Sequence, residues 1–253
     1  NYVYVNLKAL RIIIQKDAIR EDKILPPEKN PFLRFTLPEL LPAYKEKLDI
    51  NEIDKIEALQ LQKDTFLYHV RNAFIFSLYN AGIRIGDLLQ LRWCNVKEDG
   101  RLEYYPGKTG KERSIKLLLQ PLKILRLYYS EDAKETDYIF PFLDSNSNHS
   151  GMVFPEDFQR ASPEFLELLY KKIESQVSMF NQALKTIARK AEIKKNITSR
   201  ISRHSFADIA RKKNISVYDI QKMLGHSSVK ITEAYLKSLD NDVTDKAMSE
   251  VFH

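Results

Sequence analysis

The sequence predicts a mainly α-helical protein with a small antiparallel β-sheet, an α+β fold. Apolar residues recur at helical spacing through most of the 253 residues. The stretch from Leu102 to Leu119 differs, because the strand-like runs LEYYP and RSIKLLL flank the turn sequence GKTGKE. Two short strands joined in this way are typical of a β-hairpin.

The chain begins with a predicted helix followed by a proline-rich linker. The helix has one apolar face, formed by Tyr4, Leu7, Leu10, Ile14 and Ala18. Five of the ten prolines then lie between Leu25 and Pro42. Because proline lacks a backbone donor and restricts its neighbours, this stretch is expected to be extended. We therefore place a domain boundary near residue 45 and expect domains 1–45 and 46–253.

The second domain is expected to be mostly helical. Its first helices are predicted over residues 51–59 and 68–80, and Gly82 suits a helix end with positive φ before IGDLLQL resumes the helix. Pro121 fits the first turn of the helix QPLKILRLYY. A long helix is predicted over residues 163–190, followed by the three short helices RISRHSFADIARKK, SVYDIQKML and SVKITEAYLKSL. Ser216 with Asp219 forms an N-terminal cap of the second of these, and Gly225 ends it.

Composition argues against several classes of protein. The single cysteine, Cys94, excludes an internal disulfide framework and a Cys-rich zinc site. The seven glycines form neither G-x-G-x-x-G nor a P-loop, so no ATP, NAD or other cofactor is expected. No apolar run approaches the roughly 18 residues of a membrane helix, and the N-terminus lacks the layout of a secretion signal. We expect no membrane association and a reducing cytoplasm.

Positive charge is concentrated in one segment. Residues 182–240 hold 13 Lys and Arg against 5 Asp and Glu, a net +8, whereas the remaining residues hold 27 basic and 29 acidic side chains. Such a concentration favours a surface for a polyanion. The alternative is a solvated helical surface.

The same segment contains residues suited to phosphate chemistry. Arg200 and Arg203 are three positions apart and share a helical face, so both guanidinium groups could point at one phosphate. His226 follows a glycine at a helix end, and Tyr235, nine residues later, could act as a nucleophile. SVYDIQKMLGHSSVKITEAYL also has the pattern of a helix-turn-helix.

Four stretches in order resemble the motifs of the tyrosine recombinase (phage integrase) family. The resemblance runs from about Leu48 to Leu239, and the four stretches read AGIRIGDLLQLRW, YYPGKTGKERSIKL, RHSFA and LGHSSVKITEAYLKS. The first helix and Asn30-Pro31-Phe32 resemble the end of the family's core-binding domain, particularly in integrases of mobile elements from the Bacteroides group. Residues 1–45 would then be the remnant of that domain with its linker, and residues 46–253 a catalytic domain with the DNA breaking-rejoining fold.

The resemblance implies site-specific DNA recombination, the integration or excision of a bacterial mobile element, without metal or ATP. Tyr235 would attack a DNA phosphate to form a 3′-phosphotyrosyl bond and release a 5′-hydroxyl. Arg84 and Arg203 would hold the phosphate, His226 would donate a hydrogen bond to it, and Lys108 would protonate the leaving oxygen, with Lys111 as the competing candidate for that role.

The resemblance also implies partners. Double-stranded DNA attachment or core sites would be bound with the help of Lys111, Arg113 and Lys230. The protein would be a monomer when free and a homo-tetramer on DNA, with DNA-bending or directionality factors as accessories. An apolar stripe in the tail, formed by Leu239, Val243, Ala247 and Val251, would dock on a neighbouring subunit.

One position departs from the family pattern and leaves a question open. Arg200 stands where the family commonly has His or Lys, and arginine cannot accept a proton at physiological pH. We assign Arg200 as a third phosphate contact, so the proton acceptor for Tyr235 remains unassigned. His204 is expected to be a packing residue, because it points off the face shared by Arg200 and Arg203. The alternative functions are a non-catalytic helix-turn-helix DNA-binding protein and a cleavage-deficient recombinase.

Overall fold

The computed structural model describes residues 2–38 and 45–239 of a chain that divides into two units, residues 1–44 and 45–253. Unit 1 contains α1 (Tyr2–Ile13), a π-helical stretch (Ile14–Glu21) and a 3-10 turn (Pro27–Lys29). Both helical stretches lack buried residues, and several large apolar side chains of α1 are exposed. Of the expected apolar face, Leu10 is exposed, and Tyr4, Leu7, Ile14 and Ala18 are half-buried.

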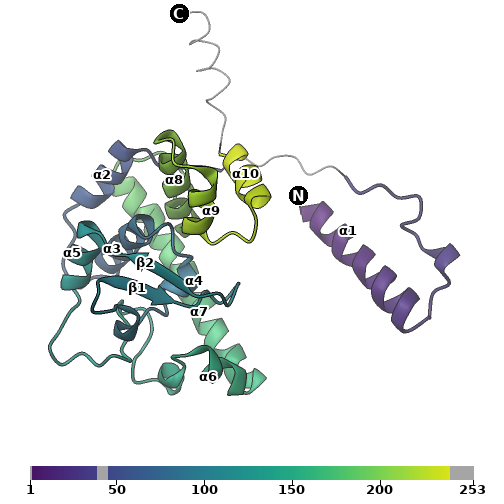
Figure 1. The fold of residues 1–253 in the computed structure, drawn as a ribbon, viewed down its shortest axis with the longest axis horizontal. Helices are drawn as coiled ribbons and strands as arrows, with labels where there is room; N and C mark the ends of the chain where they lie inside the picture. The colour runs from purple at the N-terminus through teal and green to yellow at the C-terminus, as the bar shows by residue number, and fades with distance from the viewer. Residues whose placement is uncertain (1, 39–44, 240–253) are drawn as a thin grey trace, which may run out of the picture. The chain divides into compact units, whose positions relative to one another are not determined.

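Unit 2 is mainly helical, with one two-stranded antiparallel sheet, as the sequence predicts (Figure 1). The strands are β1 (Arg101–Tyr104) and β2 (Arg113–Lys116), paired so that Tyr104 faces Arg113. The helices are α2 (Ile50–Ala58), α3 (Phe66–Tyr79), α4 (Ile85–Leu88), α5 (Leu119–Arg126), α6 (Pro155–Arg160), α7 (Pro163–Lys190), α8 (Ser199–Lys212), α9 (Val217–Leu224) and α10 (Val229–Lys237).

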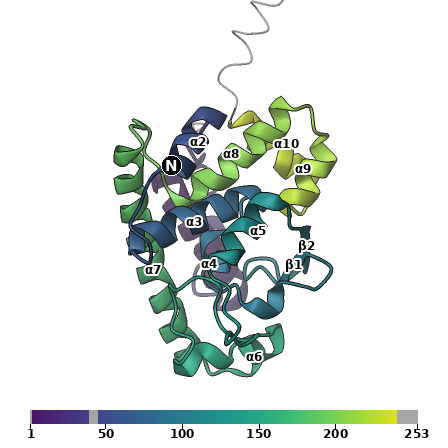
Figure 2. The same ribbon diagram turned by 90° about the vertical axis from the view of Figure 1, so that its left-hand side faces the viewer.

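Helix α3 forms the centre of unit 2. Val70, Phe74 and Phe76 are at most 1% exposed, and α3 packs against α5, α7 and α8. Figures 1 and 2 both place α8, α9 and α10 together at one end of unit 2, with α6 at the opposite end. A helix that is apolar on nearly all sides is stable only inside a protein, so α3 acts as the scaffold for the elements around it.

Local capping explains where the helices begin and end. Asp49 and Glu52 form a reciprocal capping box at the start of α2, each bonding the other's backbone N–H at 2.9 Å. The Ser216 hydroxyl accepts from the Asp219 backbone N–H at 3.1 Å, and Gly225 ends α9 with φ 64°. Both predictions for α9 are confirmed.

The prediction of a positive φ at Gly82 is also confirmed, and the structure adds a second reason for glycine. Its φ is +65°, and a Cβ built there would lie 2.3 Å from Cα of Arg203. The chain that leaves α3 therefore touches the backbone of α8 directly. This contact brings the loop before Arg84 to the start of α8.

No helix among the described residues is long and apolar enough to cross a membrane.

Candidate active site

Arg203 of α8 connects the ends of two other helices. Its guanidinium donates to the Gly82 carbonyl at 3.1 Å and to the Leu224 carbonyl at the end of α9. Burial, together with the positive charge of Arg84, lowers the pKa of Arg203 to about 10. The side chain stays cationic at neutral pH and is held in one place before any ligand arrives.

Arg84 and Asp87 connect α4 to the β-hairpin. Arg84 is the N-cap residue of α4, and its charge acts on both Arg203 and His226. The Asp87 Oδ1 accepts from the Gly107 backbone N–H at 3.0 Å, next to Lys108 in the hairpin turn. Burial raises the pKa of Asp87, while that hydrogen bond and the neighbouring arginines act in the opposite direction. Asp87 thus fixes the base of the loop that carries Lys108.

His226 follows Gly225 in the turn between α9 and α10. Its Nδ1 lies 3.0 Å from the Thr232 hydroxyl, and its ring meets the ring of Tyr235 edge to face at 5.4 Å. Burial, followed by the charge of Arg203, lowers the pKa of His226 to about 4. The imidazole is therefore neutral at pH 7.

Tyr235 of α10 lies between two histidines. Its hydroxyl is 2.5 Å from Nδ1 of His204, and its ring packs against the rings of His204 and His226. The Lys45 ammonium lies 4.5 Å from the centre of the same ring. Burial raises the pKa of Tyr235, and the charge of Arg203 opposes this shift.

His204 packs against the Tyr235 ring, as expected of a packing residue, but it also contacts the Tyr235 hydroxyl, which the sequence analysis did not predict. Successive residues on a helix are rotated by about 100°, so His204 leaves the face of Arg200 and Arg203 but faces α10 and bonds Tyr235. The two residues are 31 positions apart. Local spacing could not reveal the pair, because it depends on how α8 packs against α10.

The remaining predicted site residues lie at the surface. Lys108, Lys111, Arg200 and Lys230 are exposed. Arg113 is partly buried and donates to the Met223 carbonyl in the last turn of α9. The structure therefore brings Arg84, Arg203, His226 and Tyr235 together and adds His204, while the three lysines are exposed. Arg200 is exposed too, but its charge acts on His204.

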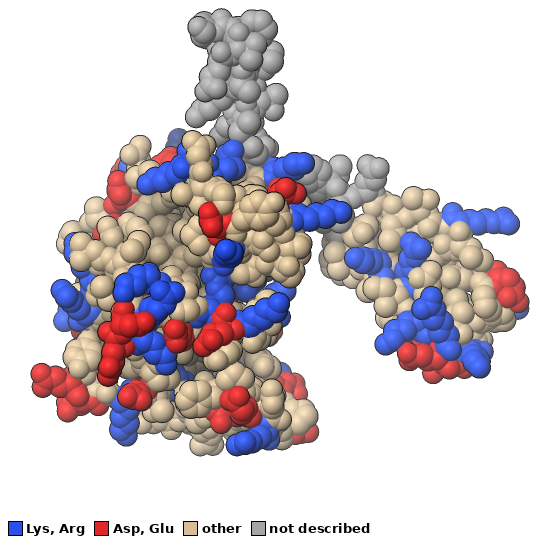
Figure 3. All heavy atoms as spheres, viewed as in Figure 1, with Lys and Arg blue, Asp and Glu red and all other residues tan. Residues whose placement is uncertain are grey.

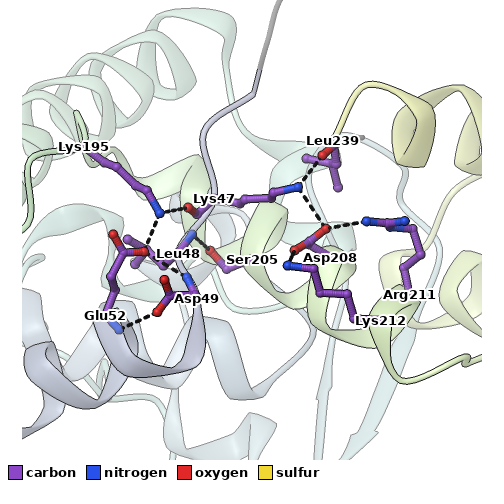
Figure 4. Close-up of polar contacts among 10 residues, drawn as sticks. All are labelled: Lys47, Leu48, Asp49, Glu52, Lys195, Ser205, Asp208, Arg211, Lys212 and Leu239. Carbon is purple, nitrogen blue, oxygen red and sulfur yellow. Dashed lines mark hydrogen bonds and ion pairs between the residues drawn. The ribbon is translucent and has the colours of Figure 1, made fainter. Parts of the chain in front are cut away.

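A buried polar network holds the end of α10 (Figure 4). The Lys47 ammonium donates to Asp208 at 3.2 Å and to the Leu239 carbonyl at 2.5 Å, and Lys47 and Asp208 are 8% and 2% exposed. Asp208 also accepts from Arg211 at 3.1 Å and pairs with Lys212 at 2.9 Å. The network ties the segment before α2 and the end of α10 to α8, which carries Arg203 and His204.

Figure 3 draws one face of the molecule, with Lys and Arg in blue and Asp and Glu in red. Lys and Arg side chains there are interspersed with Asp and Glu. Among residues 2–38 and 45–239, no three His, Cys, Asp or Glu side chains are grouped so that they could hold a metal ion.

In this mainly helical domain, the phenol of Tyr235 lies beside two histidines and within the field of Arg203. This set of side chains is typical of proteins that act on an anionic ester. The chain belongs to the phage integrase family, whose model matches residues 46–242. The fold and the resemblance seen in the sequence are thereby confirmed.

Two curated relatives illustrate the similarity. The chain is 24% identical over 207 residues to tyrosine recombinase XerC of Myxococcus xanthus, covering 82% of this chain and 60% of that protein. It is 26% identical over 223 residues to XerA of Pyrococcus furiosus, covering 88% and 63%. The chain thus spans about three fifths of the length of these relatives.

Solved structures share the fold. The XerA recombinase crystal structure matches with a TM-score of 0.51 and 23% identity, covering 99% of this chain and 75% of that one. The integrase of transposon Tn1549, in complex with circular-intermediate DNA, matches with a TM-score of 0.57 and 20% identity, covering 98% and 76%.

Proposed function

We propose that the chain is the catalytic part of a site-specific recombinase that cuts and rejoins double-stranded DNA through a covalent 3′-phosphotyrosyl intermediate. The observation that carries the proposal is the Tyr235 hydroxyl, held beside His204 and His226 within the field of Arg203. Membership of the phage integrase family supports it.

Each residue has a role that its chemistry suits. The Tyr235 oxygen attacks the phosphorus and the bond to the 5′-oxygen breaks. Arg84 and Arg203 contact the non-bridging oxygens, where negative charge increases in the transition state. His226 donates a hydrogen bond to the phosphate, and Lys108 gives a proton to the leaving oxygen. Lys111 remains the alternative donor, and Arg200 is the third phosphate contact.

The reaction would need neither metal nor nucleotide in this scheme. The arginines supply the positive charge, and the energy of the broken phosphodiester is retained in the phosphotyrosine. A 5′-hydroxyl from a second DNA end can then reverse the step and join a new partner.

The substrate would be the attachment or core sites of a mobile element that is integrated or excised. The likeness to the Tn1549 integrase, which is bound to circular-intermediate DNA, supports a DNA substrate. Lys111, Arg113 and Lys230 are proposed to contact DNA, and residues 1–45 to be the end of a core-binding domain.

Assembly is proposed to follow the family pattern, a monomer when free and a homo-tetramer on DNA, with accessory DNA-bending or directionality factors. The tail stripe was predicted to dock on a neighbouring subunit. Apart from Leu239, which is buried against the cluster formed by α8 and α9, its residues lie outside the described part of the chain.

The proposal is tested with a duplex that carries the junction sequence of the genetic element encoding the chain and a nick beside the cleavage position. Wild-type protein should form an adduct that survives denaturation and is removed by protease. Tyr235→Phe should bind the duplex equally well, since it lacks only a hydroxyl, and form no adduct. An adduct mapped to another tyrosine would contradict the assignment, and binding without any adduct would favour the helix-turn-helix alternative.

A further inference from the structure

His204 touches the one atom whose proton must leave for the proposed reaction to occur. Its Nδ1 lies 2.5 Å from the Tyr235 oxygen, and the centroids of the two rings are 5.5 Å apart. The imidazole is partly buried on α8, one residue after Arg203. In the tautomer whose ring proton is on Nε2, the hydroxyl donates and Nδ1 accepts, and the other tautomer reverses these roles.

The surroundings keep His204 in the form that can accept a proton. Burial lowers its pKa to about 4, and the positive charges of Lys45, Arg200 and Arg203 act in the same direction. Lys45 comes from the segment before α2, Arg200 and Arg203 from α8, and Tyr235 from α10. With a hydroxyl donating to Nδ1, the single ring proton of neutral imidazole is on Nε2.

The other candidates for this role are worse placed. Arg200 is exposed and cannot accept a proton at physiological pH. His226 meets Tyr235 through an edge-to-face ring contact, and its Nδ1 faces the Thr232 hydroxyl. Lys45 lies over the face of the Tyr235 ring and donates to the Ser238 hydroxyl at 2.7 Å.

We propose that His204 is the proton acceptor for Tyr235, and so a catalytic residue absent from the sequence-based assignment. The inference rests on the proposed function of Tyr235. As the tyrosine oxygen bonds to phosphorus, its proton passes to Nδ1 of His204, which becomes an imidazolium. The bond from phosphorus to the 5′-oxygen breaks, and that oxygen takes its proton from Lys108. Rejoining returns both protons.

The test separates accepting a proton from donating one. The probe is the junction duplex with a 5′-bridging sulfur at the cleavage position, because a thiolate leaves without needing an acid. Single-turnover adduct formation is compared on this duplex and on its oxygen counterpart. Lys108→Ala should be slow on oxygen and recover on sulfur. His204→Ala should be slow on both, by about 10²–10⁴-fold, the usual contribution of a general base.

A second variant separates chemistry from positioning. His204→Asn retains an acceptor oxygen near the place of Nδ1 but has no basic nitrogen. It should bind DNA as wild type does and cleave as slowly as His204→Ala. Near-wild-type cleavage by His204→Asn would show that His204 only positions the hydroxyl. Faster cleavage by His204→Ala would show that it holds Tyr235 in an inactive state, and either result overturns the proposal.

One control variant and the wild-type result make the outcome unambiguous. His149→Asn, altered at a histidine that packs on Phe165 of α7, should cleave like wild type. If wild-type protein forms no adduct, the proposed function fails, whereas an adduct formed equally well by wild type and His204→Ala rejects only the role of His204.

The tautomer can be measured without DNA. Nitrogen-15 chemical shifts at pH 7 should show Nδ1 of His204 unprotonated and Nε2 protonated, with a shift of the Nδ1 signal in Tyr235→Phe. A protonated Nδ1 would exclude His204 as the acceptor in this geometry.

Discussion

The cluster around Tyr235 and the turn of the β-hairpin differ in how much of their geometry is fixed by the protein itself. Tyr235, His204, His226 and Arg203 are each held by hydrogen bonds or ring contacts from at least one other element. In the hairpin turn, Lys108 is exposed, and no described atom lies within 4 Å of a Cβ added at Gly110. The protein itself thus fixes the side chain of the proposed nucleophile, Tyr235, but not that of the proposed acid, Lys108, which we expect DNA to fix.

The largest expected effect comes from two glycines that have nearly the same φ and lie in these two regions. Gly82→Ala should lower the free energy of unfolding by about 2–5 kcal/mol, because left-handed strain adds to overlap with the Arg203 backbone. Gly110 has φ +61° and open space around an added Cβ, so Gly110→Ala should lower the free energy of unfolding only through backbone strain, by about 1–2 kcal/mol. Denaturant unfolding of both variants measures the difference, and equal losses would mean that α8 does not need the close contact.

The buried network at the end of α10 should be the next most sensitive. Lys47→Met should lower the free energy of unfolding by roughly 1–3 kcal/mol. This is less than the effect of breaking an isolated buried ion pair, because Asp208 keeps its contacts with Arg211 and Lys212. Lys171→Met is the matched control, since it breaks an exposed pair with Glu167 that is worth about 0.5 kcal/mol or less. A loss for Lys47→Met no greater than for Lys171→Met would remove this network as the support of α10.

A pH effect should follow from the two histidines beside Tyr235. Both have a pKa near 4 when folded, against about 6.5 in an unfolded chain. The unfolded chain therefore binds more protons between these values, and the free energy of unfolding should fall as pH drops from about 6.5 to 4. The effect is on the order of 1–2 kcal/mol, since solvent access reduces the full linkage value.

Unfolding of wild type, His204→Asn and His226→Asn across this range provides the check. Each variant should flatten the slope of the free energy of unfolding against pH relative to wild type. A wild-type slope retained in both cluster variants would contradict the buried neutral histidines.

The smallest effect on stability is expected at Arg200, which is exposed. Arg200→Ala should change the free energy of unfolding by less than about 0.5 kcal/mol, yet slow cleavage by about 10²–10³-fold if it contacts the phosphate. Arg200→Lys should keep part of the rate, because the charge stays and the planar fork is lost. Single-turnover rates on pre-bound substrate measure whether Arg200 contributes to cleavage. If Arg200→Ala cleaves at the wild-type rate, Arg200 lies outside the site.

The sequence predicted most of the fold because its signals are local. Helical periodicity, the hairpin turn, the cap at Ser216 and the glycine at position 225 each depend on residues that are near in sequence, and α7 begins and ends where it was predicted. The family motifs added Arg84, Arg203, His226 and Tyr235, which the structure brings together.

What the sequence could not predict depends on packing between distant segments. The contact between His204 and Tyr235 joins residues on different helices, and Lys47 meets Asp208 across 161 positions. The overlap that requires glycine at position 82 likewise exists only because α8 lies against the end of α3. Such pairs have no characteristic spacing, so periodicity and capping rules do not reveal them.

Hydrogen–deuterium exchange with and without junction DNA tests most directly whether the protein holds Tyr235, the proposed nucleophile, in place before DNA binds. DNA should slow exchange strongly in residues 105–112 of the hairpin turn and leave exchange in α10 and in the stretch around His204 nearly unchanged. The opposite pattern, with α10 exchanging fast in free protein and becoming protected only on DNA, would show that DNA assembles the site around Tyr235 and that the free protein does not hold it in place.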